Sequence, residues 1–302
     1  MRFLDKFLIG LALLMFGHSL YEAFVEKWDD LAGLARRPPP AWQAPQPQPG
    51  TVPGVGDPAP RRLPPRIAML PPIAERDPAI GVNPSKPRQA NQRSTGTAFA
   101  VGRDGAWLTA KHVIDDCKRV LIRRGDGWDP AAVDFADGVT DIALLRARAG
   151  VSLLPVTAGP LGLGEDGYAF GFAGQGGPSS IHATLLGRAR TVHGGRSGGS
   201  TPVLAWAERE WQPPGERWIG GMSGGPLITS EGAVAGIMSV ASERRGRIYT
   251  VAPEVIGRIM RDRGLAFAPQ GAAPIAATGE NFDRVKSELM NRRTVVQVLC
   301  TG

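Results

Sequence analysis

A serine flanked by glycines is the strongest chemical signal in this chain of 302 residues. The segment reads Gly220-Gly221-Met222-Ser223-Gly224-Gly225-Pro226. Glycine adopts backbone angles that residues with a Cβ avoid, and it lets a substrate carbonyl approach the main chain. Such a turn can expose the Ser223 hydroxyl as a nucleophile and direct the N–H groups of Gly221 and Ser223 at one oxyanion. Alone it is weak evidence, because glycine-rich turns are common in a chain with 40 glycines.

Two upstream segments supply the partners that such a nucleophile needs. Residues 107–114 (WLTAKHVI) predict an apolar strand that ends in a small-residue corner carrying His112. Residues 140–145 (TDIALL) place Asp141 at the start of a strongly apolar strand, where burial would force the carboxylate to pair. Ser223 would attack a carbonyl, His112 would take its proton and return it to the leaving amine, and Asp141 would hold the imidazole.

Ordinary interpretations compete with each of these assignments. A histidine at a strand end is usually a surface or core residue, and that interpretation is kept for His18, His182 and His193. Most aspartates are solvated. The competitors for the carboxylate role precede no comparable apolar run; they are Asp115, Asp116, Asp134 and Asp137.

The three segments together resemble a known protein family. LTAKH, TDIALL and GMSGGPL, in the chain order His, Asp, Ser, are similar to the catalytic segments of the trypsin/chymotrypsin superfamily. The compact first half is most similar to the bacterial trypsin-like, HtrA-type branch, and the resemblance covers roughly residues 94–263. It implies a serine endopeptidase with His112, Asp141 and Ser223 as its triad, acting on peptides or proteins without a cofactor.

Two later segments resemble the walls of the family's primary specificity pocket. GIMSV at 236–240 is similar to the strand beside the pocket, and IYTV at 248–251 to the strand that closes it. The resemblance implies that Ser239 hydrogen-bonds Asp141 and offers its carbonyl to the substrate. The expected substrate-binding residues are Ser239, Val240 and Ala241.

Two arginines bear on the preference for the P1 residue, the substrate residue that enters this pocket. Arg217 and Arg247 either border the pocket or point to solvent. If they border it, they disfavour basic P1 residues and favour small, apolar or acidic ones.

The sequence departs from the family pattern at Met222. Many activated digestive proteases have an aspartate here, which pairs with the amino terminus released by cleavage. Since Met222 cannot form that salt bridge, either local packing or a ligand must shape the oxyanion hole.

Cys117 and Cys300 are the chain's two cysteines. In an oxidising compartment they form one bridge that pins the tail to the first barrel, worth roughly 4 to 5 kcal/mol in the chain-entropy model. The alternative is two free, buried thiols. The sequence does not decide between them.

The first 25 residues are expected to set the compartment. Phe7 to Gly17 is an apolar run preceded by Arg2 and Lys6, which is typical of a signal sequence or a short membrane anchor. No small-x-small cleavage site follows at the usual distance, which favours an uncleaved anchor over a cleaved signal or an internal helix. The positive-inside rule then leaves the rest of the chain outside the cytoplasm, periplasmic in a Gram-negative bacterium.

Residues 26–93 are expected to form a Pro-rich linker. Prolines cluster between residues 37 and 88, which excludes helix and central strand and predicts an extended, solvated segment. Its one apolar island, at 67–70, is expected to lie along the protease domain. The linker is interpreted either as a spacer or as a tail without a role.

Composition limits the other partners. A hydrophobic content of 42% allows a core of ordinary size. The net charge of +7 comes from dispersed arginines without a nucleic-acid motif, so no nucleic-acid partner is expected. Scattered histidines and distant cysteines predict no metal site. The oligomeric state is left undetermined.

Short β-rich runs separated by turn residues predict an all-β domain at 94–265. With the resemblance, this implies a chymotrypsin-like fold of two antiparallel six-stranded barrels at about 94–155 and 160–252, then a helix at 253–263. Strands are expected at 97–101, 106–110, 119–123, 131–135 and 142–145, and then at 167–172, 181–192, 202–207, 226–229, 233–240 and 247–251. In the tail, residues 266–302, a helix is expected at 281–292 and a strand at 294–299 that docks beside the first barrel near Cys117.

Two functional classes fit these residues. The favoured one is the serine endopeptidase, and the alternative is a catalytically silent protease-fold module that binds peptides. An esterase would use the same chemistry as the endopeptidase.

Overall fold

The computed structural model describes residues 68–82, 93–148, 152–157, 159–174, 177–193, 199–215 and 218–302. All of them belong to a single compact unit, Leu63–Gly302. The expected membrane segment at 1–25 and most of the Pro-rich linker lie outside the described residues. None of the helices in the described ranges has the length and apolar character needed to cross a bilayer.

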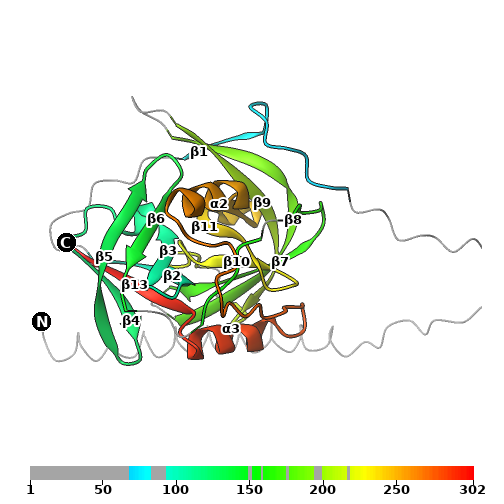
Figure 1. Ribbon diagram of the computed structural model, residues 1–302. Coiled ribbons are helices and arrows are strands. Elements are labelled where there is room, and N and C mark those ends of the chain that lie inside the picture. The colour runs from blue at the N-terminus through cyan, green and yellow to red at the C-terminus, as the bar shows by residue number, and fades with distance from the viewer. Residues whose placement is uncertain are drawn as a thin grey trace, which may run out of the picture. The chain divides into compact units, whose positions relative to one another are not determined.

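Six strands close the first barrel (Figure 1), in the order β13-β2-β3-β6-β5-β4. They are β2 (Ser94–Gly102), β3 (Ala106–Ala110), β4 (Arg119–Arg124), β5 (Gly127–Asp137), β6 (Ile142–Arg146) and β13 (Val295–Thr301). Each of the first five contains the strand expected from the sequence. In β4 the side chains of Val120 and Ile122 are buried and the flanking arginines are not, as an alternating apolar pattern dictates.

The sixth strand comes from the end of the chain. β13 lies between β2 and β4 and pairs antiparallel with both, so that Val298 stands opposite Gly96 on one side and Ile122 on the other. Without it, β2 and β4 would each present an unpaired edge. The barrel that was expected to end near residue 155 therefore extends into residues 266–302.

A second set of six strands closes through the pairing of β8 with β9, in the order β8-β7-β10-β11-β12-β9. The strands are β7 (Asp166–Ala173), β8 (Gly177–His193), β9 (Ser200–Gln212), β10 (Pro226–Thr229), β11 (Val234–Ser242) and β12 (Arg247–Val251). Every pairing within this barrel is antiparallel. The predicted fold class, all-β with two six-stranded antiparallel barrels, is confirmed.

Part of the expected linker is structured. β1 (Ala79–Val82) adds to β8 as a parallel edge strand, and Arg190 on β8 donates to the Asp77 carbonyl at 3.1 Å. The Leu70 N–H donates to the Leu161 carbonyl at 2.7 Å. The apolar island thus contacts the protease domain at Leu70, as expected, whereas the edge strand at 79–82 was not expected from the sequence. Prolines exclude a central strand but leave an edge strand available.

Two helices follow the second barrel. α2 (Pro253–Asp262) matches the expected amphipathic helix and buries Val255, Ile256, Ile259 and Met260. α3 (Phe282–Asn291) packs against β8 and buries Phe282, Val285 and Leu289. Two 3₁₀ turns, η1 (Lys111–Val113) and η2 (Glu243–Arg245), are the remaining regular elements of the described ranges.

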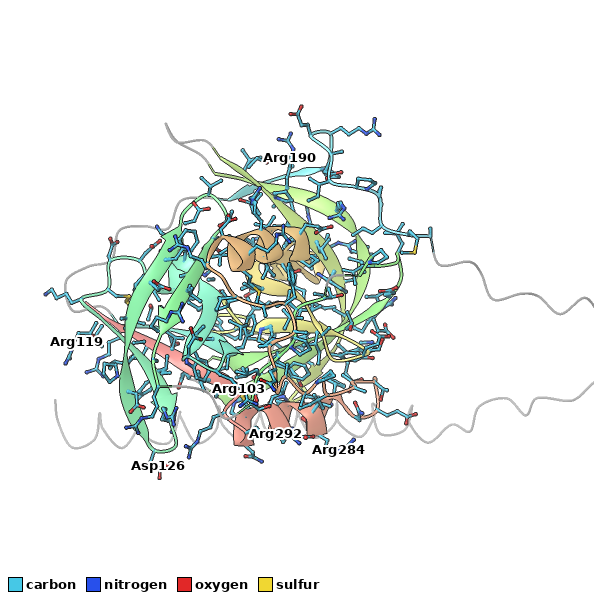
Figure 2. All side chains as sticks on the ribbon, in the orientation of Figure 1. Arg103, Arg119, Asp126, Arg190, Arg284 and Arg292 are labelled. Carbon is cyan, nitrogen blue, oxygen red and sulfur yellow. A yellow bond between two sulfur atoms is a disulfide. The ribbon has the colours of Figure 1, made fainter. Side chains whose placement is uncertain are left out.

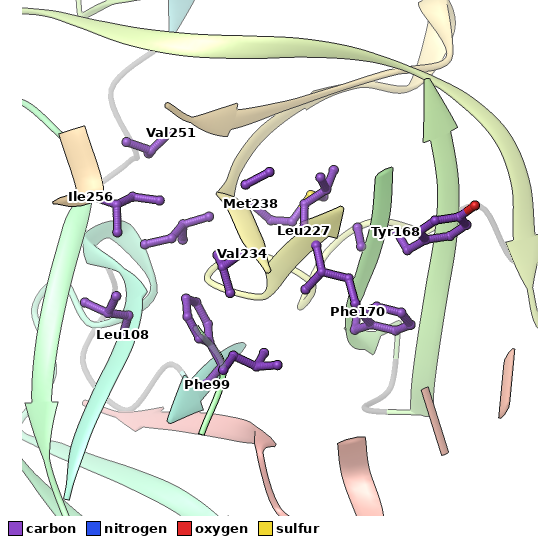
Figure 3. Packing of buried hydrophobic residues seen from close by; sticks show 14 of the residues in the cluster. Phe99, Leu108, Tyr168, Phe170, Leu227, Val234, Met238, Val251 and Ile256 are labelled. Atoms are coloured by element: carbon purple, nitrogen blue, oxygen red, sulfur yellow. The ribbon is translucent and has the colours of Figure 1, made fainter. Parts of the chain in front are cut away.

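One hydrophobic core joins the two barrels. Figure 3 shows Phe99 and Leu108 of the first barrel packed together with Phe170 and Val234 of the second. All four side chains are fully or almost fully buried. Because protein interiors are close-packed, this shared core fixes the relative positions of loops that come from different barrels.

The charged side chains are spread over the surface. Figure 2 shows Arg103, Arg119, Arg190 and Arg292 at separate places around the ribbon. This dispersion agrees with the interpretation of the basic charge as a solvated surface.

Candidate active site

The pairing of β3 with β6 brings His112 and Asp141 together. Ala110, the last residue of β3, stands opposite Ile142, the first residue of β6. His112 follows in η1 and Asp141 precedes β6, so both lie at the same end of the barrel. The Lys111 N–H donates to the Asp141 carbonyl at 3.0 Å, which ties the two corners directly.

Asp141 accepts hydrogen bonds from two barrels. Its Oδ2 lies 2.8 Å from His112 Nδ1, and its Oδ1 accepts the His112 backbone N–H at 2.9 Å. From the second barrel, the Ser239 hydroxyl donates to Oδ2 at 2.5 Å. The contact that the family resemblance implied for Ser239 is thus present in the structure. Asp141 also has φ of 56°, a left-handed conformation of the kind that gathers at functional sites when neighbours over-determine it.

The environment keeps the Asp141 carboxylate ionised. Burial alone would raise its pKa, but the hydrogen bonds and the charge of His112, together with the Ser239 hydroxyl, outweigh that effect and lower the pKa below its ordinary value of 3.8. A charged carboxylate at this position fixes the ring orientation of His112 and favours the proton on Nδ1.

The glycine turn, residues 220–225, depends on backbone that other residues would disrupt. Gly221 and Gly224 have φ of 96° and 84°. A Cβ on Gly221 would overlap the Phe172 carbonyl, and one on Gly224 would overlap the Thr97 carbonyl. A larger residue at position 221 would therefore push the turn away from β7 of the second barrel, and one at position 224 would push it away from β2 of the first.

Two backbone donors of the turn are unused by the protein. Within the described part of the chain, the N–H groups of Gly221 and Ser223 donate no hydrogen bond. Nearly all backbone N–H groups in folded proteins have partners, so two such donors in one tight turn are available to a ligand.

Met222 occupies the position of the missing aspartate as a core residue. Its side chain is fully buried in the shared core. Its N–H donates to the Ile219 carbonyl at 3.0 Å, and its carbonyl accepts the Gly225 N–H at 2.9 Å. Local packing thus holds the turn at the place where a salt bridge acts in the digestive enzymes.

A small cavity of about 30 Å³ adjoins Ser223. It is lined by Ile219, Ser223, Met238, Ser239, Val240 and Ala241. The structure thereby brings all three expected substrate-binding residues to the expected nucleophile. Ile219 and Met238 carried no separate signal in the sequence, although Ile219 lies just before the glycine turn and Met238 within the strand that resembles a pocket wall. Arg217 lies outside the described residues, and Arg247 is not among the lining residues.

The two cysteines are bonded to each other. Cys117 and Cys300 form a disulfide with Cα atoms 5.3 Å apart, within the usual range for such bonds. It joins the segment after His112 to β13. Over the described ranges, no group of three His, Cys, Asp or Glu side chains is arranged to hold a metal ion.

Residues 96–237 match the family model described as the trypsin-like peptidase domain. This part of the chain is similar to trypsin-like peptidase domains. The matched range holds all three expected triad residues and both proposed oxyanion donors. β12, both α-helices and β13 lie beyond it, so the strand that closes the first barrel follows the matched segment.

Curated relatives agree with this assignment over parts of their length. The chain is 32% identical to serine protease HTRA1 of Xenopus tropicalis over 147 residues, which are 48% of this chain and 31% of that protein. The mitochondrial serine protease HTRA2 of Bos taurus is 31% identical over the same shares. An uncharacterized protein of Sinorhizobium fredii, y4bJ, is 28% identical over 72% of this chain and 34% of its own length. The chain thus spans about a third of the length of these relatives.

Solved structures of proteases match the chain at lower identity. The active form of the Rv3671c protease of M. tuberculosis gives a TM-score of 0.49 at 20% identity, covering 69% of this chain and 99% of that one. The HtrA-type protease AlgW with a decapeptide gives 0.44 at 18% identity, covering 55% and 50%.

Proposed function

We propose that this trypsin-like domain is a serine endopeptidase that works through an acyl-enzyme. The observation that carries the proposal is the hydrogen-bonded series Ser239, Asp141, His112, beside a cavity that Ser223 borders. The base, the orienting carboxylate and the nucleophile lie on three loops at one end of the first barrel. Two of these loops belong to the first barrel and one to the second. This arrangement of roles supports the proposal of a Ser-His-Asp site more strongly than any single motif does.

The proposed reaction has two halves. Ser223 Oγ attacks the carbonyl carbon of the scissile bond while His112 takes the hydroxyl proton. The resulting oxyanion accepts hydrogen bonds from the N–H groups of Gly221 and Ser223. His112 then gives its proton to the leaving amine and the C–N bond breaks, which leaves an acyl group on Ser223. Water, deprotonated by His112, attacks that ester, and the carboxylate product leaves as Ser223 regains its proton.

Asp141 supports both halves without exchanging a proton. Its Oδ2 accepts the Nδ1–H of His112 at 2.8 Å and faces the imidazolium that forms each time His112 is protonated. A lowered pKa suits this role, since the carboxylate stays charged while the imidazole titrates beside it.

Fluorophosphonate labelling tests the proposal. We expect the folded domain to form a covalent adduct at Ser223 and the Ser223→Ala variant to form none. A folded protein that stays unlabelled and behaves like that variant would instead be the silent binding module. Competition between a peptide and an ester substrate for the labelled enzyme separates an endopeptidase from an esterase.

The cavity beside Ser223 indicates a small, apolar P1 residue. Its volume is small, about 30 Å³, and its lining contains no charged side chain, which favours a small, apolar substrate side chain. A basic P1 residue would have no carboxylate to pair with there. We therefore propose peptides with alanine or valine at P1 as the preferred substrates.

Enlarging the cavity should change this preference. We expect Ile219→Ala to raise kcat/KM for leucine relative to alanine at P1 by about 10- to 100-fold, because removing methylene groups in a pocket changes discrimination by 1–3 kcal/mol. A peptide library read by mass spectrometry measures the shift. The control is Leu186→Ala, an exposed apolar residue that is not among the lining residues. An unchanged P1 profile for Ile219→Ala would remove this cavity from consideration as the specificity pocket.

We further propose that the peptidase domain works outside the cytoplasm, attached through the apolar segment at 7–17. The Cys117–Cys300 bond supports an oxidising compartment, because disulfides persist there and are rare in the cytosol. Alkylating intact cells before lysis tests the proposal: a protein recovered with both cysteines alkylated would contradict it.

A further inference from the structure

Hydrogen bonds hold the peptide groups that carry the two oxyanion donors. The Gly174 N–H donates to the Gly220 carbonyl at 3.0 Å, and the Gly225 N–H donates to the Met222 carbonyl at 2.9 Å. A peptide group is planar and trans, so an anchored carbonyl directs the N–H of the same group to the opposite side. These bonds therefore set the directions of the N–H groups of Gly221 and of the serine.

Thr97 holds two further peptide groups of the turn. It lies on β2 and is fully buried. Its hydroxyl donates to the Gly221 carbonyl at 2.8 Å, and its backbone N–H donates to the Ser223 carbonyl at 2.8 Å. The same hydroxyl accepts the Phe172 N–H at 3.1 Å, which ties β7 into the arrangement.

The backbone of Thr97 is itself held in place. Its carbonyl accepts the hydroxyl of Thr109, a buried residue of β3, at 2.7 Å. β2 and β3 belong to the first barrel, whereas the glycine turn precedes β10 of the second. Thr97 therefore connects the rigid strand behind His112 to the loop that carries the nucleophile.

We propose that the Thr97 hydroxyl is the positioning group that keeps the oxyanion hole in its catalytic geometry. The inference rests on the proposed endopeptidase function. In the digestive enzymes a salt bridge to a freed amino terminus does this work, and here the equivalent position holds the uncharged, buried Met222. A hydrogen bond from Thr97 requires no cleavage of the chain, so the turn is competent in the unprocessed protein.

The Thr97 hydroxyl is necessary because its partner, Gly221, is a glycine. Gly221 gains freedom of rotation as soon as its carbonyl loses a partner, because no Cβ restricts its backbone. A buried carbonyl without a donor is costly, and so is the Phe172 N–H without an acceptor. Both groups would turn towards new partners, and the peptide on which the oxyanion donor lies would turn with them.

A pair of variants tests the role of the hydroxyl. Thr97→Val keeps the shape and removes the hydroxyl, and we expect kcat to fall about 10- to 100-fold while KM changes less than about twofold. Thr97→Ser keeps the hydroxyl and should recover most of that loss. A peptide boronic acid, which forms a tetrahedral adduct with the serine, should lose affinity by the same factor as kcat/KM, whereas a product peptide should not.

A matched control separates positioning from stability. Thr191→Val also removes a buried hydroxyl bonded to a backbone carbonyl, that of Thr201 on β9, and it should leave kcat unchanged. If Thr97→Val and Thr191→Val have the same kcat, the proposal is overturned.

Hydrogen exchange measures the local stability of the glycine turn independently of activity. In Thr97→Val, amides of residues 219–225 should exchange faster than in the wild type and in Thr191→Val. Unchanged exchange overturns the positioning role even if the domain proves inactive. Conversely, if fluorophosphonates do not label the wild type, the proposed endopeptidase function is contradicted. The exchange result then decides the role of Thr97 by itself.

Discussion

Replacing Asp141 by asparagine is expected to lower kcat by about four orders of magnitude, the loss typical of Ser-His-Asp sites, while KM changes little. The amide keeps the size of the carboxyl but presents donors where His112 Nδ1–H needs an acceptor. The imidazole would then carry its proton on Nε2, from which it cannot accept the Ser223 proton. Steady-state kinetics on a P1-alanine peptide measures the effect.

Asp134→Asn is the matched control for this substitution. Asp134 forms an ion pair with Arg146 on the outside of the first barrel, with Oδ2 and Nε 3.0 Å apart. Surface pairs of this kind contribute little, so activity and stability should stay near those of the wild type. A loss of kcat smaller than tenfold in Asp141→Asn would show that this carboxylate does not orient the base.

The Asp141→Asn variant also tests how the stability of the protein depends on pH. The pKa of Asp141 lies below 3.8 in the folded protein. A lowered folded-state pKa adds stability that is present above the unfolded-state value and is lost as pH falls through the folded one. As pH falls below about 4, the free energy of unfolding should therefore fall more steeply for the wild type than for Asp141→Asn. Urea titrations across that range measure both slopes.

Removing the disulfide is the second change expected to have a large effect. We expect the double variant Cys117→Ala, Cys300→Ala to lose about 2–5 kcal/mol of the free energy of unfolding. The bond links residues separated by 183 positions, so it restricts a long loop of the unfolded chain. In the folded protein it ties β13, the strand that closes the first barrel, to the segment after His112.

Denaturant titration with and without dithiothreitol checks this prediction. The wild type should lose stability on reduction, and the double variant should not respond to the reductant. β13 keeps its pairing with β2 and β4 in both cases, so the folded state should survive. Equal transition midpoints for the oxidised wild type and the double variant would show that strand pairing alone secures the tail.

Local patterns were sufficient for most of the secondary structure. Alternating and continuous apolar runs predicted eleven strands that the structure contains. The prediction works because a strand that buries one face has an apolar residue at every second position. The amphipathic helix α2 was predictable for the same reason, with a period of 3.6 residues. β1 was not, since Ala79–Val82 lies among prolines and becomes a strand only because β8 offers an edge.

Some residues of the candidate site were predictable from the sequence and others were not. His112, Asp141 and Ser223 were found by residue type, neighbours and order, and the Ser239–Asp141 contact by family resemblance. Thr97, Ile219 and Met238 were not found. Their proposed roles depend on contacts between the two barrels. The residues around Thr97 in the sequence do not indicate that its hydroxyl bonds to a carbonyl 124 residues away.

The sequence by itself predicted the residues of the proposed chemistry, which are a candidate nucleophile in a glycine turn, a candidate base and a candidate carboxylate, together with two sets of strands. Only the tertiary structure decided that the last strand closes the first barrel, that the two cysteines meet, and that Thr97 holds the turn. The physical reason is that side-chain patterning records whether a residue is buried, whereas hydrogen-bond and disulfide partners depend on barrel closure, which joins segments far apart in the chain.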